Sequence, residues 1–168
     1  MGRDIARRRG ALRLIPATVV IAVGRGRGSE EQALFDRYAG RLRPVPRLVE
    51  IADARGRAVE ARRREAEVIL AAVPAGAVLV ALDLGGADET TEAFAARLAR
   101  WRDAGRTVAF AIGGAEGLDG AVIARAQHVL AFGRATWPHL LVRAMLAEQL
   151  FRADSLSRGH PYHRAGRP

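Results

Sequence analysis

The run Val78–Leu84, with the sequence VLVALDL, is the stretch that decides the fold class. It is apolar except for Asp83, which is typical of a strand buried on both faces. Two further runs have the same character, Thr18–Val23 (TVVIAV) and Thr107–Ile112 (TVAFAI). Strands that are apolar on both faces occur almost only in parallel sheets with helices on either side. We therefore expect an α/β protein.

Helical periodicity fills the intervals between these runs. Ser29 and Gln32 match a capping box, and Pro44 and Pro46 stop the helix that it opens. The further expected elements are a short edge strand Leu48–Ile51, helix Ala58–Val73, a helix capped by Asp88, Thr90 or Thr91, helix Leu118–Ala126, strand His128–Ala131 and a last helix from Pro138 to about Asp154. This alternation predicts a parallel sheet with ligands at the carboxyl ends of its strands.

Length and composition limit the classes of function that are open to this chain. The 168 residues suit one domain, and the 49% of apolar residues can build a core. The absence of cysteine excludes disulfides, thiolate metal sites and cysteine nucleophiles. The four histidines lack the spacing of a metal motif, so we expect no metal. No apolar run is long enough for a membrane span and no secretory signal is visible, which favours the cytoplasm.

The chain is strongly basic, with a net charge of +9 carried only by arginine. Residues 1–65 hold 16 arginines against 8 acids, whereas residues 66–168 hold 11 against 10. Such a charge attracts nucleic acid, although a solubilising surface would have the same composition. Residues 1–17 precede the first strand and are expected to form a flexible basic extension, or to stem from an upstream start codon.

Glycine-rich segments follow the expected strands. Gly24–Gly28 (GRGRG) is either an exposed turn or a dinucleotide loop with Glu50 or Asp53 as its acid, but its spacing is not G-x-G-x-x-G. A chain without lysine also lacks a Walker motif. Ile112–Leu118 (IGGAEGL) is either a tight turn or a loop where backbone approaches a ligand. Phe132–His139 (FGRATWPH) suits an adenine or sulfonium ligand, or is an ordinary turn.

Two features near the C-terminus stand out. Apolar residues surround much of the last helix, which is therefore either a deeply packed core helix or one that also meets a second subunit. These residues are Leu140, Leu141, Val142, Met145, Leu146, Leu150 and Phe151. The terminal His160–Arg164 (HPYHR) combines rings that stack on bases with guanidinium groups that bind phosphate.

Together these segments resemble the ribosomal RNA large subunit methyltransferase H family, small members of the SPOUT methyltransferases. The match runs from about Thr18 to Arg164. It is carried by Ala22-Val-Gly24, Ala81-Leu-Asp83, Ile112-Gly-Gly with Glu116-Gly-Leu118, Pro138-His139, Val142-Arg143, Glu148 with Phe151-Arg-Ala153, and His160-Pro-Tyr-His-Arg164.

The resemblance implies a fold and a reaction. Residues 18–168 would form a single methyltransferase domain with a C-terminal deep trefoil knot, an otherwise rare feature. The domain would form a homodimer through the last helix. It would transfer a methyl group from S-adenosylmethionine to N3 of a pseudouridine in 23S ribosomal RNA, presented by an assembled ribosome.

The resemblance also implies site residues. Cofactor contacts would come from Leu82, Gly113, Phe132, Gly133, Arg134, Ala135, Thr136 and Trp137. Residue chemistry adds two alternative catalytic candidates: Arg143 could stabilise the developing imide anion, or His163 could instead take its proton. The substrate would be held by His139, His160, Tyr162 and Arg164.

Two rival functions come from other classes. A non-catalytic ribosome- or RNA-binding protein is supported by charge alone and predicts no tight S-adenosylmethionine binding. A Rossmann oxidoreductase is supported only by Gly24–Gly28 and predicts NAD binding.

Overall fold

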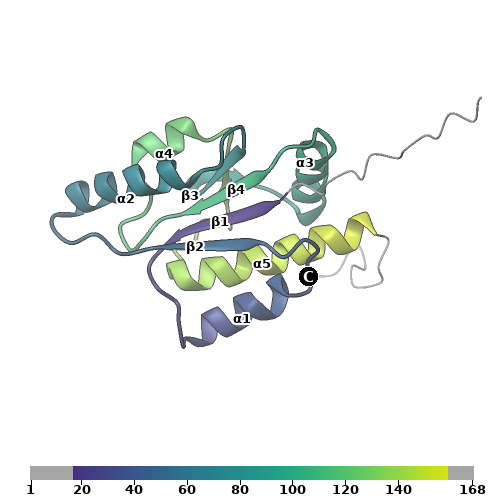
Figure 1. The fold of residues 1–168 in the computed structure, drawn as a ribbon, viewed down its shortest axis with the longest axis horizontal. Helices are drawn as coiled ribbons and strands as arrows, with labels where there is room; N and C mark the ends of the chain where they lie inside the picture. The colour runs from purple at the N-terminus through teal and green to yellow at the C-terminus, as the bar shows by residue number, and fades with distance from the viewer. Residues whose placement is uncertain (1–16, 159–168) are drawn as a thin grey trace, which may run out of the picture.

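The computed structural model describes residues 17–158, which form a five-stranded parallel sheet in the order β2-β1-β4-β3-β5 (Figure 1). β1 pairs in parallel with β2 and β4, and β3 pairs in parallel with β4 and β5. In chain order the elements are β1 (Thr18–Val23), α1 (Glu30–Ala39), β2 (Arg47–Ile51), α2 (Ala58–Ala72), β3 (Val78–Asp88), α3 (Thr91–Asp103), β4 (Val108–Ile112), α4 (Gly120–Arg125), β5 (His128–Ala131) and α5 (His139–Ser157).

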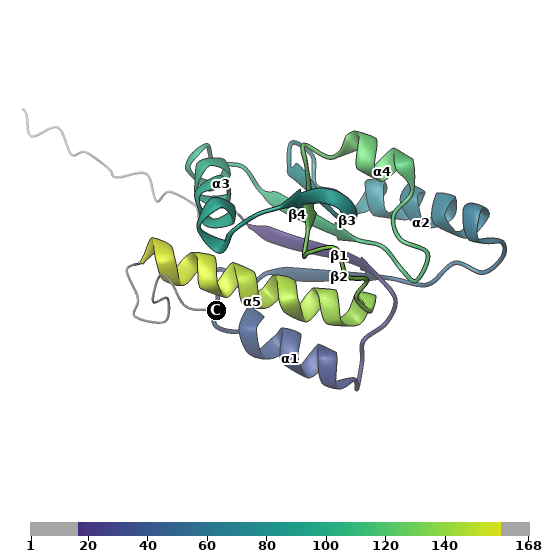
Figure 2. The same ribbon diagram turned by 180° about the vertical axis from the view of Figure 1, so that it is seen from behind.

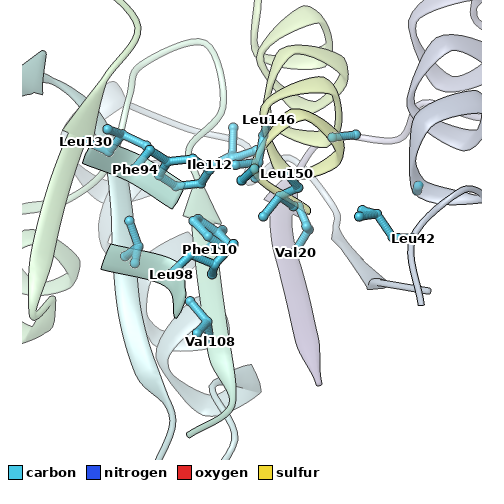
Figure 3. Packing of buried hydrophobic residues seen from close by; sticks show 14 of the residues in the cluster. Val20, Leu42, Phe94, Leu98, Val108, Phe110, Ile112, Leu130, Leu146 and Leu150 are labelled. Carbon is cyan, nitrogen blue, oxygen red and sulfur yellow. The ribbon is translucent and has the colours of Figure 1, made fainter. Parts of the chain in front are cut away.

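Helices cover both faces of the sheet, as the apolar runs predict. Side chains of α2 and α4 pack with Val19 and Ile21 on one face. Side chains of α1, α3 and α5 pack with Val20 and Ala22 on the other. The two turned views show α1 and α5 together below the sheet and α2 and α4 above it (Figures 1 and 2). Figure 3 shows Phe110 of β4 beside Leu98 and below Phe94, both of α3. The α/β prediction is confirmed.

Most element boundaries agree with the sequence pattern. β1 and β5 have the expected bounds, and β2 lies at an edge of the sheet. Ser29 Oγ accepts the Gln32 N–H at 3.0 Å, so the predicted N-cap is present. The Gln32 side chain instead donates to Asp36 at 2.8 Å, which leaves the capping box half formed. Thr90 caps α3 by accepting the Ala93 N–H at 3.2 Å.

The sequence pattern fails at the end of β3. The expected strand stops at Leu84, whereas β3 continues to Asp88 with a register shift between Leu82 and Ala87. Gly86 makes this possible, because a Cβ there would lie 2.6 Å from the carbonyl carbon of Leu130 in β5. Pairing with β5 therefore overrides the weak strand preference of the two glycines in this segment.

The last helix is longer than expected and lies between two other helices. α5 contacts α1 and α3 as well as β1 and β4. This position buries Leu146 and Leu150 fully, whereas Leu141 and Met145 stay half-buried. Leu146 and Leu150 therefore belong to the core, whereas Leu141 and Met145 line a groove that is described below. The implied knot stays a prediction. Within residues 17–158, no helix is long and apolar enough to cross a membrane.

Candidate active site

The middle of β3 and the loops that follow β4 and β5 meet the start of α5 at the carboxyl edge of the sheet. A cavity of about 420 Å³ lies between them, and we call it the glycine-loop pocket. Its walls come from residues 82–84, 112–117, 130–132 and 135–137 together with His139 and Val142. Six of the eight predicted cofactor residues line it, namely Leu82, Gly113, Phe132, Ala135, Thr136 and Trp137.

Two hydrogen bonds fix the segment 132–137 at one side of this pocket. The Trp137 indole donates to the carbonyl of Phe132 at 3.0 Å, which closes the segment on itself. The Gly133 N–H donates to Asp88 Oδ1 at 3.0 Å, which ties the segment to the end of β3. Gly133 has φ +80°, a conformation that favours glycine. The Trp137 ring remains 43% exposed and is available for stacking on a ligand.

Two of the predicted cofactor residues lie elsewhere. Gly133 lines a second cavity on the other side of the 132–137 segment. Arg134 is exposed and does not contribute to either cavity wall. Cofactor contact by these two residues stays a prediction.

Gly113 lines the pocket and is also part of the tight turn that the sequence offered as one alternative for this segment. A Cβ at Gly113 would lie 2.5 Å from the carbonyl carbon of Gly117. The Gly117 N–H also donates to Gly114 at 3.0 Å, so the segment folds tightly back on itself. Gly113 therefore shapes the pocket wall through contact between backbone segments.

His139 is the first residue of α5 and lines the glycine-loop pocket. Its ring lies against Gly24 at the end of β1, where a Cβ would be 2.6 Å from His139 Nε2. The predicted substrate contact is thus brought to the pocket, and the close approach explains why Gly24 is glycine.

Arg143 does not line the pocket. Its side chain is 1% exposed and donates to the carbonyls of Val23 and Gly24 at 2.7 and 2.5 Å. It also forms an ion pair with Glu50 at 2.8 Å. Glu50 is one of the two acids in the dinucleotide alternative, and here it contacts Arg143 and the Gly26 N–H. The structure thus gives the Gly24–Gly28 segment and its acid an explanation without a dinucleotide.

The second cavity, of about 620 Å³, lies between α1, α5 and the start of α3, and we call it the helical groove. Its apolar wall includes Leu34, Leu141 and Met145, and its polar wall includes Glu89 and Glu148. Sequence analysis missed the groove as a cavity. The signal for it was the wide apolar circumference of the last helix.

A buried polar cluster lies behind the groove. Glu89, whose side chain is 7% exposed, pairs with Arg97 at 2.5 Å. His128 Nε2 is 3.3 Å from the same carboxylate oxygen, but it is not oriented to form a hydrogen bond. Burial and the charge of Arg97 lower the pKa of His128, and Glu89 only partly opposes them. The 3.3 Å between His128 Nε2 and the Glu89 carboxylate is therefore not an ion pair: with a lowered pKa, the ring is neutral at pH 7 and lies beside the Glu89–Arg97 pair.

Four predicted site residues, His160, Tyr162, His163 and Arg164, lie outside the residues that the structure describes. Within residues 17–158, no group of three histidine or carboxylate side chains is arranged to hold a metal ion.

The glycine-loop pocket suits S-adenosylmethionine. Its volume is within the usual range for small-ligand sites. Apolar side chains and close backbone form most of its walls, as an adenine ring and a methionine chain need. The pocket contains the carboxylates of Asp83 and Glu116 but no lysine or arginine, and negative charge is favourable beside a sulfonium cation.

Comparison with known proteins agrees with this assignment. Residues 17–163 match the family model described as predicted SPOUT methyltransferase. The ribosomal RNA large subunit methyltransferase H of Gluconacetobacter diazotrophicus is 54% identical over 149 residues, covering 89% of this chain and 98% of that protein. The protein of the same name from Acidiphilium cryptum is 52% identical, covering 89% and 94%.

Two solved structures share the fold at low sequence identity. A probable methylase family protein from Haemophilus influenzae aligns with a TM-score of 0.55 at 8% identity, over 92% of this chain and 73% of that one. TrmJ from Z. mobilis aligns with a TM-score of 0.51 at 16% identity, with the same coverage. From the family match and the identity to its relatives, the chain belongs to the SPOUT methyltransferase family.

Proposed function

We propose that this protein transfers the methyl group of S-adenosylmethionine to N3 of a pseudouridine in the large-subunit ribosomal RNA of an assembled ribosome. The observation that carries the proposal is the glycine-loop pocket, which gathers six of the expected cofactor residues from three separate segments. Relatives named for methylation of large-subunit ribosomal RNA support the substrate. Such a protein would work in the cytoplasm, where ribosomes are.

The pocket residues would hold and align the reactants. When bound, S-adenosylmethionine supplies an electrophilic methyl group for in-line displacement. Leu82 and the Trp137 ring would cover the apolar parts of the cofactor and exclude water. His139 lies at the same pocket, where it would contact the incoming base. Fixed orientation of this kind lowers the barrier, because the entropy of bringing the reactants together is lost on binding and not in the transition state.

The imide proton must leave the pseudouridine as its nitrogen is methylated. We assign its acceptance to His163 of the C-terminal segment, with His160, Tyr162 and Arg164 holding the base and its phosphate. The burial of Arg143 removes it from direct contact with the pocket, so we assign that residue a positioning role, argued in the next subsection.

A homodimer is part of the proposal. In the helical groove Leu34 is exposed and Leu141 and Met145 are half-buried, on two helices that lie side by side. A second copy packed on α5 would bury this surface and account for the remaining apolar circumference of the helix. The domain would extend from residue 18 to the C-terminus, with residues 1–17 as a basic extension.

The test uses ribosomes from a strain that lacks its own large-subunit pseudouridine methyltransferase. Incubation with labelled S-adenosylmethionine should label 23S ribosomal RNA, and mass spectrometry of nuclease fragments should identify N3-methylpseudouridine. Calorimetry should show binding of S-adenosylmethionine but not of NAD. Label on another nucleotide would overturn the substrate, and absence of S-adenosylmethionine binding would overturn the reaction.

Removal of residues 159–168 tests the C-terminal assignments separately. The truncated protein should keep its dimer and lose little cofactor affinity, because α5 and the 132–137 segment remain. Methylation should fall by orders of magnitude, since the groups assigned to positioning the base would be lost. A change in the pH–rate profile of His163→Gln would indicate proton transfer. Full activity of the truncated dimer would refute all four assignments.

A further inference from the structure

Arg143 links α5 to the ends of two strands. Burying a guanidinium is costly unless acceptors pair with its donors, and among the described residues Nη1 and Nη2 of Arg143 have acceptors whereas Nε has none. Nη2 donates to the carbonyl of Val23, the last residue of β1, and to that of Gly24, the next residue, and Nη1 donates to Glu50 near the end of β2. One side chain of α5 therefore fixes the start of the segment Gly24–Gly28, which we call the arginine–glycine loop.

Glu50 carries this connection into the middle of the loop. Its Oε1 accepts the Gly26 N–H at 2.7 Å as well as the Arg143 donor. The Gly26 hydrogen bond and the positive charge of Arg143 lower the pKa of Glu50, although partial burial opposes them. The Gly24 N–H donates to Ile51 at 2.8 Å, and the Gly26 carbonyl accepts from Ser29 at 2.9 Å. The loop backbone is thus held at its beginning, middle and end.

Glycines and arginines alternate in the loop and point in different directions. Gly24 and Gly26 are buried, whereas Arg25 and Arg27 are exposed. A Cβ at Gly24 would meet His139 at 2.6 Å, and one at Gly26 would meet Gln32 at 2.7 Å. The alternation therefore places both guanidinium groups on the solvent side of a fixed backbone. Within residues 17–158, neither guanidinium forms a hydrogen bond or a close ion pair, although the charge of Arg25 is near enough to Glu50 to help lower the pKa of that carboxyl.

The loop lies beside the glycine-loop pocket. Gly24 contacts the His139 ring, and His139 lines the pocket. Arg25 follows Gly24 directly, so the two exposed arginines begin next to the expected position of the target base. Arg25 and Arg27 are separated by one residue, and their long side chains let each guanidinium reach a different phosphate.

We propose that Arg25 and Arg27 bind backbone phosphates of the RNA beside the target base, and that Arg143 and Glu50 are positioning residues that hold this loop in place. The proposal rests on the proposed function and deepens it by naming a substrate-binding surface. Guanidinium groups bind phosphate through paired, charge-assisted hydrogen bonds. Such contacts set the orientation of the RNA and carry no sequence information.

The first experiment removes the two exposed charges. Arg25→Gln/Arg27→Gln is compared with Arg100→Gln/Arg125→Gln, which removes two exposed charges at the C-terminal ends of α3 and α4. Anisotropy with a fluorescent single-stranded RNA at several KCl concentrations gives the salt dependence of binding. The slope of log K against log[salt] should fall by about 1.4 for the loop variant, since each phosphate contact on a single strand contributes about 0.7.

The same two variants are assayed for methylation of ribosomes. The loop variant should raise KM for ribosomes about tenfold or more, with unchanged affinity for S-adenosylmethionine, and the control should do neither. Equal effects of the two variants would overturn the proposal, because general charge would then explain the loss. The RNA-binding measurement does not depend on the methylated nucleotide, so a wrong substrate assignment would leave it informative.

The second experiment separates positioning from catalysis. Arg143→Lys keeps a buried cation and Glu50→Gln keeps a carbonyl acceptor for Gly26, so at least one variant should fold. Both should raise KM for ribosomes with kcat changed less than about threefold, because the loop is displaced and the pocket is not. A large fall in kcat at unchanged KM, in a variant with normal thermal stability, would overturn the positioning role.

Discussion

The glycine-loop pocket and the helical groove differ in what forms their walls. Loop backbone and small residues build the pocket, and glycines fix its shape by allowing segments such as 113–117 to fold tightly. Side chains of α1 and α5 build much of the groove, and its shape depends on half-buried residues such as Met145. A wall of fixed backbone suits a small ligand, whereas a wall of apolar side chains suits a protein surface.

The largest expected effect comes from a substitution that disrupts the backbone wall of the glycine-loop pocket. In Gly113→Val, the new Cβ would lie 2.5 Å from the Gly117 carbonyl carbon, so the loop must move. We expect destabilisation of about 2–3 kcal/mol, as for other overpacked sites, together with loss of S-adenosylmethionine binding. Urea unfolding and calorimetry measure the two effects.

Gly120→Ala is the matched control for Gly113→Val. Gly120 begins α4, and a Cβ there would meet nothing within 4 Å. Alanine should stabilise the helix slightly and leave cofactor binding unchanged. If Gly113→Val were as stable as the original protein, the tight turn would not be what shapes the pocket.

The next effect concerns the groove and tests whether a second copy covers it. Met145→Glu places a charge on the half-buried apolar wall. We expect dimer dissociation to increase about 30-fold or more, equivalent to about 2 kcal/mol, with the pocket still able to bind cofactor. Analytical ultracentrifugation gives the dissociation constant. Val68→Glu, on the exposed side of α2, should leave it unchanged. The reverse pattern would place the interface on the other face of the sheet.

The difference between the two cavities also explains what sequence could predict. Apolar runs such as Thr18–Val23 determine a buried strand locally, so β1 appeared with its expected bounds. The pocket was predictable because parallel strands bring their following loops to one edge. The burial of Arg143 could not be predicted from local sequence, because it depends on the carbonyls of Val23 and Gly24 and on a carboxylate of β2, more than 90 positions away along the chain. The groove required the packing of α1 on α5, which no local pattern contains.

A smaller effect is expected at the open side of the pocket. Trp137→Ala removes a ring that is 43% exposed together with its hydrogen bond to the Phe132 carbonyl, so stability should fall by about 1 kcal/mol. Cofactor affinity should fall about tenfold if the ring covers the ligand. Calorimetry gives the affinity and thermal unfolding the stability. Trp101→Phe is the control, because Trp101 packs near His128 and not at the pocket. Equal affinities of the two variants would show that the pocket holds its ligand by backbone alone.

The smallest expected effect is a pH dependence of stability that comes from His128, beside the helical groove. Burial, followed by the charge of Arg97, lowers the pKa of His128 below its ordinary value of 6.5, and Glu89 only partly restores it. The unfolded chain therefore binds a proton more readily than the folded protein as the pH falls below 6.5. The contribution of His128 to the free energy of unfolding is fully present above pH 6.5, and it is lost as the pH falls through the lowered pKa of the folded protein.

His128→Gln should remove this part of the pH dependence. Urea unfolding at pH 7.5 and at pH 5.5 gives two free energies for each protein, and their difference should be smaller for the variant than for the original protein. Glu50, whose pKa is also lowered, affects both proteins alike and only at more acidic pH. A larger difference in the variant would mean that Glu89 stabilises a charged ring. The wall behind the groove would then be held by an ion pair, whereas the structure indicates a neutral histidine packed beside one.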